Sequence, residues 1–180
     1  MSLDEIAPYE IRLIGDPVLR QVANEIENID SSLVALSNDM VLTMRAAAGL
    51  GLAAPQVGVQ KRFFVYDMGE GPRTIVNPVV QESEGEWLFD EGCLSFPDMS
   101  FEIVRASIVH VTGHDLDGNE VSVEADEVLG RLFLHELDHL NGILLLDHLD
   151  DEQLKVAKKE LRLRAMQMPS RPSVGGLQLP

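Results

Sequence analysis

The chain has 180 residues, a formal net charge of −16 and an apolar content of 45%. This length is typical of one domain with a sizeable hydrophobic core. The negative charge argues against nucleic acid as the main partner, because most of the surface would repel a phosphate backbone. No segment is apolar for long enough to span a bilayer, and the N-terminus is acidic where a targeting peptide would be basic. We therefore expect a cytoplasmic protein without a membrane segment.

The first helix is expected over residues 31–48. Apolar residues recur there at every third or fourth position, which is the spacing of one helix face. Ser31 or Ser32 suits the N-cap, and Gly49 suits the stop. The preceding residues 11–20 are expected to form an extended run that ends in a Gly-Asp-Pro turn.

A glycine-rich apolar segment, residues 49–56, follows this helix. Its first, third and sixth residues formally satisfy the dinucleotide fingerprint Gly-x-Gly-x-x-Gly/Ala, which requires a strand before it and a helix after it. Here a helix precedes the segment, and Pro55 removes a backbone donor where a second helix would begin. We therefore expect a loop whose backbone can approach a ligand closely and which ends in the amide of Gln56.

Four segments rich in β-branched and aromatic residues are expected to be strands: residues 62–66, 74–80, 103–112 and 121–124. A turn at residues 115–119 joins the last two into a hairpin. The intervening segment carries Cys93, the only cysteine of the chain. Gly92 beside it permits an unusual backbone conformation, and Pro97 is expected to end the segment.

The helix expected over residues 126–141 is apolar almost all round, as in a helix buried at the centre of a fold. An Asp at its start and an Asn-Gly at its end suit its caps. Gly130 in its interior costs about 1 kcal/mol relative to Ala, which indicates close packing against another element. Another helix is expected over residues 150–168.

This central helix carries a His-Glu-x-x-His pattern. Residues four apart lie on the same helix face, so His135 and His139 can both direct a ring nitrogen at one metal ion. Glu136 lies close enough to serve as a general base without being a ligand. The alternative is an ordinary amphipathic helix whose two histidines are surface or hydrogen-bonded core residues.

A metal held by two histidines needs a third protein ligand. Cys93 is the sole thiol, and a turn-forming glycine could present it; the alternatives are a small buried hydrophobe or a nucleophile. Two imidazoles and one thiolate leave one tetrahedral position open for water, which is typical of a catalytic site.

Together these elements predict an α+β fold. Antiparallel β-sheets should pack around a central metal-binding helix, with one N-terminal and one C-terminal helix. We expect a single catalytic domain over residues 1–168 that includes the C-terminal helix, followed by a flexible, Pro/Gly/Ser-rich tail over residues 169–180.

Three motifs resemble those of the peptide deformylases. They are Gly-Leu-Gly-Leu-Ala-Ala-Pro-Gln at residues 49–56, Glu-Gly-Cys-Leu-Ser at 91–95 and His-Glu-Leu-Asp-His at 135–139. They occur in the order of that family, and the resemblance covers residues 11–150. This chain departs from the family at Leu134, where the family usually has Gln at a position that is not a ligand.

The resemblance implies a metal-dependent hydrolase that removes the formyl group from the N-terminal formyl-methionine of newly made proteins and releases formate. By similarity, Cys93, His135 and His139 would bind the metal, and its water would attack the formyl carbon. Glu136 would receive the proton of this water and deliver it to the departing amine.

The resemblance also implies how the substrate is held. The oxyanion would be stabilised by the metal, the Leu94 backbone N–H and the Gln56 side-chain amide, and Gly51 would contact the substrate through its backbone. The methionine side chain needs an apolar pocket. From the helix faces, we expect this pocket to be lined by Leu50, Val128 and Leu132.

The family commonly uses Fe²⁺, and Zn²⁺, Ni²⁺ or Co²⁺ can occupy the same kind of site. The expected partners are formyl-methionyl nascent peptides, no membrane is expected to take part, and the protein is expected to be a monomer. Six of the fourteen Lys and Arg residues fall between Lys155 and Arg171. This basic helix is either a solvated face or a contact with ribosomal RNA close to the nascent chain.

Several residues have two possible roles. Arg105 could pair with Glu91 or be a solvated residue at a strand end. Asp138 could orient a ligand histidine or form an ion pair elsewhere. The remaining histidines of the second half are not expected to be ligands: His110, His114 and His148.

Two other functions are compatible with the His-Glu-x-x-His pattern. One is a metallopeptidase that cleaves internal peptide bonds, although such enzymes usually have His or a carboxylate as the third ligand. The other is a structural metal site with four protein ligands in an interaction module.

Overall fold

The computed structural model of the protein describes residues 7–167. The chain divides into two compact units, one up to His148 and one from Leu149. The first unit contains two α-helices and all the strands, and the second contains the helix α3 (Asp151–Gln167). In the described part of the chain, no helix is long and apolar enough to cross a membrane.

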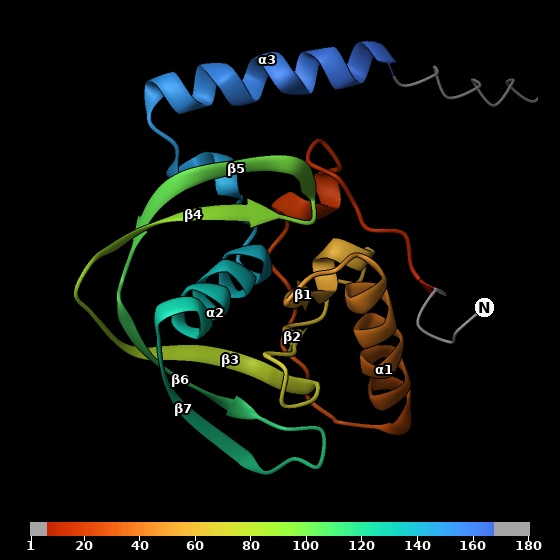
Figure 1. The fold of residues 1–180 in the computed structure, drawn as a ribbon. Coiled ribbons are helices and arrows are strands. Elements are labelled where there is room, and N and C mark those ends of the chain that lie inside the picture. Colours follow the sequence, from red (N-terminus) through yellow and green to blue (C-terminus); the bar gives the residue numbers. More distant parts are fainter. Residues whose placement is uncertain (1–6, 168–180) are drawn as a thin grey trace, which may run out of the picture. The chain divides into compact units, whose positions relative to one another are not determined.

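The main sheet of the first unit has five antiparallel strands in the order β1-β2-β3-β6-β7. Their bounds are β1 Gly51–Ala53, β2 Phe63–Tyr66, β3 Arg73–Glu84, β6 Ile108–His114 and β7 Glu120–Asp126. A separate antiparallel hairpin pairs β4 (Trp87–Cys93) with β5 (Phe96–Arg105). Figure 1 shows the helix α2 (Glu127–Leu140) lying between this hairpin and the main sheet.

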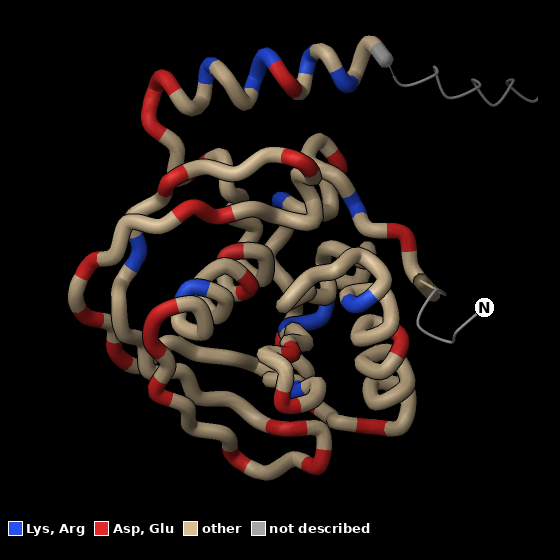
Figure 2. Tube along the Cα trace, in the orientation of Figure 1, with Lys and Arg blue, Asp and Glu red and all other residues tan. Residues whose placement is uncertain are grey.

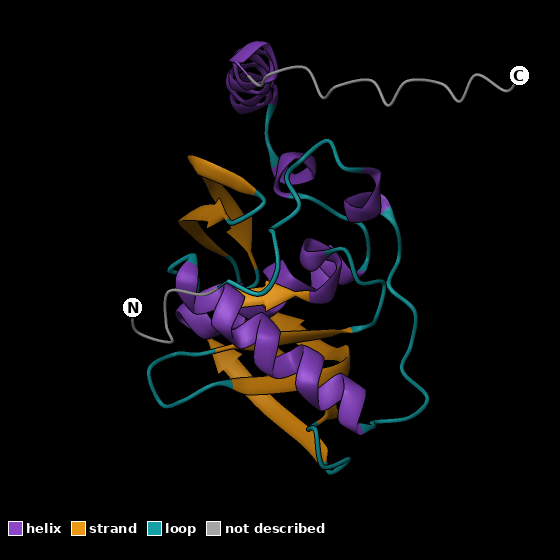
Figure 3. Cartoon of the chain, turned by 90° about the vertical axis from the view of Figure 1, so that its right-hand side faces the viewer, coloured by secondary structure: helices purple, strands orange, loops and turns teal. Residues whose placement is uncertain are grey.

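The strand β2 separates two hydrophobic cores. Successive side chains of a strand point to opposite faces, and all four of its residues are buried. Phe64 and Tyr66 pack with the buried face of α2, whereas Phe63 and Val65 pack with α1 (Ser31–Ala46). Figure 3 shows α1 lying across the sheet face that is turned away from α2. The sheet on which α2 packs is thus covered on its other face by α1.

The helix α2 confirms the expected buried central helix. An added Cβ at Gly130 would lie 2.8 Å from the carbonyl oxygen of Ala125 at the end of β7. Only a residue without a side chain permits this approach, so Gly130 allows α2 to lie close against the sheet that it follows. The resulting position brings the face with His135 and His139 toward the hairpin.

The hairpin leaves the main sheet at a corner. At this corner Gly85 has a φ of +69°, and Ser107 donates its backbone N–H to the Glu84 carbonyl over 3.0 Å. The strand expected over residues 103–112 is therefore wrong as one element, because the chain turns between β5 and β6. The expected stop at Pro97 is also wrong, since Pro97 is the second residue of β5.

Other expectations needed smaller corrections. The N-cap of α1 is Asp30, whose carboxylate accepts the Leu33 N–H over 2.9 Å, rather than Ser31 or Ser32. The extended run ends in a 3₁₀ helix at Pro17–Arg20. The glycine-rich segment contains β1 and a 3₁₀ helix at Ala54–Val57, so it lacks the strand-loop-helix context of a dinucleotide site.

The second unit confirms the expected C-terminal helix within one residue at each end. Its helix α3 carries five Lys and Arg residues and three Asp and Glu residues, against the strongly acidic chain as a whole. Figure 2 shows basic residues along α3 and acidic residues spread over the strands and loops of the first unit. The expected flexible tail, residues 169–180, lies outside the described residues, and the expected single domain over residues 1–168 stays a prediction.

Candidate metal centre and substrate pocket

Three potential metal ligands meet between α2 and the end of β4. The Sγ atom of Cys93 lies 3.3 Å from Nε2 of His139, and the Nε2 atoms of His139 and His135 are 3.2 Å apart. One ligand atom from each residue lies within 4.8 Å of the other two. In the described part of the chain, these residues form the only group of three or more His, Cys, Asp or Glu side chains with this geometry.

The donor set fits a divalent transition metal. With metal–nitrogen and metal–sulfur bonds of about 2.0–2.3 Å, tetrahedral ligands are separated by about 3.3–3.8 Å, close to the observed distances. Burial alone would raise the pKa of the Cys93 thiol, but the imidazoles of His139 and His135 lower it well below its ordinary value. A thiolate is the form that binds metal, so these residues fit the metal that the sequence predicts.

The other ring nitrogen of His135 is held by Glu91. Nδ1 of His135 lies 2.6 Å from Oε1 of Glu91, which accepts a second hydrogen bond from Arg105 over 2.7 Å. Such an acceptor fixes the tautomer of a metal-binding histidine and leaves Nε2 free for the metal. Arg105 therefore braces Glu91, which confirms the first of its two expected roles.

Glu136 lies within the fold without a partner for one of its oxygens. Its side chain is on α2 beside the histidines, only 4% of the residue is exposed, and Oε2 has no hydrogen-bond partner among the described residues. Burial raises the pKa of Glu136 to about 7, against the opposing effect of His135 and His139. A carboxyl group with a pKa near neutral pH can both accept and donate a proton there.

The amide of Gln56 is oriented toward the metal ligands. Its Oε1 accepts the Ala53 N–H over 2.8 Å. This leaves the NH₂ group to donate to Ser95 Oγ over 3.1 Å and to lie 3.9 Å from Cys93 Sγ. Leu94, in the turn between β4 and β5, lines the same pocket.

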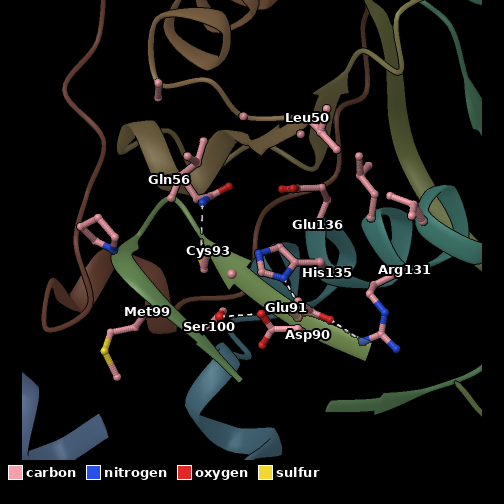
Figure 4. A pocket seen from close by; sticks show the side chains of 18 of the residues that line it. Leu50, Gln56, Asp90, Glu91, Cys93, Met99, Ser100, Arg131, His135 and Glu136 are labelled. Atoms are coloured by element: carbon pink, nitrogen blue, oxygen red, sulfur yellow. Dashed lines mark hydrogen bonds and ion pairs between the residues drawn. The ribbon is translucent and has the colours of Figure 1, made fainter. Parts of the chain in front are cut away.

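The pocket in front of the metal ligands has a volume of about 650 Å³. It is lined by all the residues expected to contact substrate: Leu50, Gly51, Val128 and Leu132. Figure 4 shows Gln56 and Leu50 on one side of this pocket, with Glu136 and His135 between them and Glu91. An added Cβ at Gly51 would lie 2.5 Å from Oε1 of Glu136, so this residue must be glycine if both groups keep their positions.

Comparisons with known proteins bear on this site. The family model described as Polypeptide deformylase matches residues 8–155. A peptide deformylase of Clostridium botulinum is 46% identical over 142 residues, which cover 79% of this chain and 97% of the relative. Another from Halothermothrix orenii is 49% identical over 140 residues, covering 77% of this chain and 91% of the relative.

The fold is similar to solved structures as well. A peptide deformylase from Legionella pneumophila has a TM-score of 0.84 at 37% identity, covering 91% of this chain and 99% of the other. One from Synechococcus elongatus, in complex with actinonin, has a TM-score of 0.83 at 36% identity, covering 86% of each chain. The chain belongs to the polypeptide deformylase family. The expected α+β fold and the expected peptide deformylase function are thereby confirmed, and the Cys93, His135 and His139 group is a candidate site for the metal on which the family depends.

Within this deformylase, the unusual Leu134 packs partly buried against the core between α2 and the main sheet. It lies outside the pocket that contains Gly51 and Glu136. The apolar side chain at this position therefore contributes to the packing of α2 against the sheet.

The contacts of Asp138 distinguish between its two expected roles. Its Oδ2 accepts from Arg105 over 2.8 Å and from His148 over 2.7 Å, so Asp138 forms an ion pair and does not orient a ligand histidine. The Nδ1 atom of His139 is buried and has no hydrogen-bond partner among the described residues. His110 contacts Ser122, and like His148 it is not part of the ligand group.

The sequence did not lead us to Arg131 or to Trp87 and Phe89 as part of the site. Arg131 lies one helical turn before His135 and donates to Glu91 Oε2 over 2.8 Å. One signal was available in the sequence: a charged residue inside a helix that is apolar almost all round must be paired when it is buried. Gly92 is not among the glycines with a positive φ, but the pairing of β4 with β5 shifts register between Gly92 and Cys93, so the backbone beside the cysteine is irregular as expected.

Proposed function

We propose that the three ligands and Glu136 together remove the formyl group from N-terminal formyl-methionine and release formate. The observation that carries this proposal is the orphan carboxylate oxygen of Glu136, buried beside Cys93, His135 and His139 at a pocket open to a substrate. A structural metal site has four protein ligands and needs no neighbouring base. A site with three ligands and a base of raised pKa is suited to hydrolysis.

Cys93, His135 and His139 would hold the metal. When bound, it lowers the pKa of a coordinated water to about 7 and polarises a carbonyl oxygen. The protein's own donors act on the oxygen of the formyl group. The Gln56 NH₂ and the Leu94 backbone N–H would donate to this oxygen as negative charge develops on it, which stabilises the transition state.

Glu136 would carry the proton. It accepts a proton from the attacking water and delivers it to the nitrogen of the methionine as the carbon–nitrogen bond breaks. This leaves formate and a peptide with a free amino terminus. Burial raises the pKa of Glu136, which favours a carboxyl group that both accepts and releases a proton near neutral pH.

The methionine side chain would occupy the apolar part of the pocket, against Leu50, Val128 and Leu132. Three features support this placement: these residues line the same pocket as the ligands, Val128 and Leu132 are one helical turn apart on α2, and Leu50 is 50% exposed. The backbone of Gly51, at the start of the edge strand β1, would contact the peptide that follows.

We propose Fe²⁺ as the metal in the cell, with Zn²⁺, Ni²⁺ or Co²⁺ as possible occupants in purified protein. The support is the mixed thiolate and imidazole donor set, which suits all four ions. A thiolate ligand next to iron is susceptible to oxidation. Protein loaded with Fe²⁺ under nitrogen should lose activity in air within minutes to hours, whereas protein loaded with Ni²⁺ should keep it; equal stability of both forms would argue against iron.

A direct assay tests the proposed reaction. The metal-free protein is reloaded with Fe²⁺, Co²⁺, Ni²⁺ or Zn²⁺ and incubated with a formyl-Met tripeptide, and formate is measured. The same preparations are incubated with an acetyl-Met tripeptide and with an unmodified longer peptide. We expect formate from the first substrate and no internal cleavage of the last. Absence of formate with all four metals would refute the proposal, and internal cleavage would favour a metallopeptidase.

We also propose that the enzyme works in the cytoplasm as a monomer and contacts the ribosome through α3. One side of this helix gathers Lys155, Lys158, Lys159 and Arg162 beside Leu163 and Met166. A cluster of Lys and Arg on an otherwise acidic protein favours binding to phosphate groups of ribosomal RNA. Such a contact would raise the local concentration of nascent chains at the enzyme.

A further inference from the structure

The strand β4 presents a regular series of side chains to α2. Residues two apart in a strand point to the same face, and Trp87, Phe89, Glu91 and Cys93 occupy every second position of β4. The last of them is the metal ligand. The first three all contact one residue of α2, Arg131, which lies in the same helix as His135 and His139.

Arg131 contacts β4 at Trp87, Phe89 and Glu91. Its Nη1 donates to Glu91 Oε2 over 2.8 Å, and its Nη2 donates to the Trp87 carbonyl over 2.6 Å. The centre of its guanidinium lies 5.1 Å from the Trp87 ring centroid and 5.6 Å from that of Phe89, within the range of cation–π attraction. Figure 4 shows Arg131 reaching from α2 toward Glu91.

Because Arg131 is buried, the loss of its contacts with β4 would be energetically costly. Only 4% of the residue is exposed. Its Nε has no partner among the described residues, so the buried charge depends on the partners of Nη1 and Nη2. Those partners are supplied almost wholly by one strand. A shift of β4 along α2 would therefore break several contacts of Arg131 at once.

Outside α2, the hairpin is held near its tip by Ser95, whose carbonyl accepts the Ile14 N–H over 2.9 Å and whose Oγ accepts from Gln56 over 3.1 Å. Within the described residues, β4 and β5 are hydrogen-bonded as strands to each other and to no strand of the main sheet. A two-stranded hairpin is at best marginally stable alone. The bonds of Ser95 hold the turn after Cys93, whereas the rest of β4 is positioned by side-chain contacts with α2. Arg131 acts from the helix, and Arg105 acts from β5 through Glu91 and Asp138.

We propose that Arg131 is a positioning residue that sets the register of β4 against α2 and so holds Cys93 at bonding distance from a metal bound by His135 and His139. The inference rests on the metal site of the proposed function and not on the deformylation itself. It assigns Arg131 an effect on metal affinity that passes through Cys93.

A double-mutant cycle tests this path. Arg131→Met keeps most of the length of the side chain and removes the guanidinium, and Cys93→Ser removes the thiolate. Co²⁺ affinity is measured by competition with a chelator in wild type, both single variants and the double variant. We expect Arg131→Met to weaken Co²⁺ binding by about tenfold or more when Cys93 is present, and by less than about threefold in the Cys93→Ser protein.

The absorption spectrum provides a second measurement. Thiolate coordinated to Co²⁺ gives a charge-transfer band in the near ultraviolet, and this band should be weakened in Co²⁺-saturated Arg131→Met protein. Arg131→Lys should restore the band and the affinity only in part, because an ammonium group keeps the charge but cannot span the Glu91 carboxylate and the Trp87 carbonyl at once.

Arg62 provides a matched control. It also ties α2 to a strand, donating to Asn141 Oδ1 at the C-cap over 2.8 Å and to the Pro78 carbonyl of β3 over 3.2 Å, but its partners lie outside β4. Arg62→Met should lower the thermal stability of the metal-free protein and leave Co²⁺ affinity unchanged.

Two results would overturn the inference. One is an unchanged Co²⁺ affinity in Arg131→Met, and the other is an equal loss in the presence and absence of Cys93, which would indicate a general loss of structure. If Arg131→Met does not fold, Arg131→Lys and Trp87→Leu take its place. Each is combined with Cys93→Ser, and Co²⁺ affinity is compared in the same way. Protein that shows the expected coupling but releases no formate would refute the proposed function and leave this inference intact.

Discussion

The Nδ1 atom of His135 lies 2.6 Å from Oε1 of Glu91, a carboxylate that is also held by two buried arginines. Burial tends to raise the pKa of Glu91, but the hydrogen bonds from Arg105 and His135 hold it well below its ordinary value. The carboxylate is therefore charged at neutral pH. It keeps a proton on Nδ1 of His135 and directs Nε2 to the metal.

Replacing Glu91 by Ala should be strongly destabilising. It leaves Arg105 and Arg131 buried without their shared partner, and breaking a buried ion pair on one side costs about 3–5 kcal/mol. Urea denaturation of the metal-free protein measures this change. Glu70→Ala is the matched control: it removes an exposed carboxylate that pairs with Arg73, and it should change stability by less than about 0.5 kcal/mol. Similar effects of the two substitutions would contradict the role given to Glu91.

Replacing Gly51 by Ala should impair turnover without unfolding the protein. The new methyl group would lie 2.5 Å from Oε1 of Glu136, so either the proton carrier or the edge strand must move. We expect kcat/KM for a formyl-Met peptide to fall by about ten- to a hundredfold. Gly92→Ala is the control, because its Cβ would meet nothing closer than the Met99 carbonyl oxygen at 3.6 Å. Full activity of Gly51→Ala would show that Glu136 is free to shift.

The pH dependence of Glu136 gives a test on the metal-free protein. Its pKa is raised from 4.5 to about 7 by burial, so the folded state binds more protons than the unfolded state between these values, and stability falls as pH rises through this window. Glu136→Gln removes that loss. The variant should be more stable than wild type by an amount that grows between pH 4.5 and 7, reaching about 3 kcal/mol, as measured by urea denaturation at several pH values.

The same variant should be nearly inactive when loaded with metal, because a Gln amide cannot accept the proton of the attacking water. A fall in kcat of about a thousandfold or more is expected from the loss of a general base. A stability difference between Glu136→Gln and wild type that does not change with pH would contradict the raised pKa. Substantial remaining activity would contradict the proton-transfer role.

Charge reversal on α3 tests the ribosome contact. Changing Lys158, Lys159 and Arg162 to Glu should weaken co-sedimentation with ribosomes by at least about tenfold at low salt, because each contact with a phosphate releases counterions. Activity on a free formyl-Met tripeptide should not change. Arg73→Glu, an exposed reversal in the first unit, serves as the control. Equal binding of the triple variant and wild type would leave α3 as a solvated helix.

The sequence predicted the elements whose signals are local. The period of apolar residues and the Asn-Gly cap located α2, and the two histidines four residues apart on it meet at one point, as expected. The hairpin turn at residues 115–119 was found from its composition for the same reason.

The hairpin β4–β5 was missed because its signal is not local. Only Arg105, Ile103 and Phe101 of β5 alternate clearly as buried positions, and their pattern runs on into β6 across the corner at Ser107. The pairing of Arg131 with Glu91 joins residues 40 positions apart. No spacing rule within one element could reveal it, and it required the position of β4 over α2.

The separation of the hairpin from the main sheet bears on how a metal ion leaves the protein. His135 and His139 belong to a helix that is packed into a continuous core, whereas Cys93 ends a strand that shares no strand pairing with the five-stranded sheet. Dissociation should therefore proceed stepwise, with the sulfur lost first and the two nitrogens last. Contacts that hold β4 against α2 should then lengthen the lifetime of the bound ion.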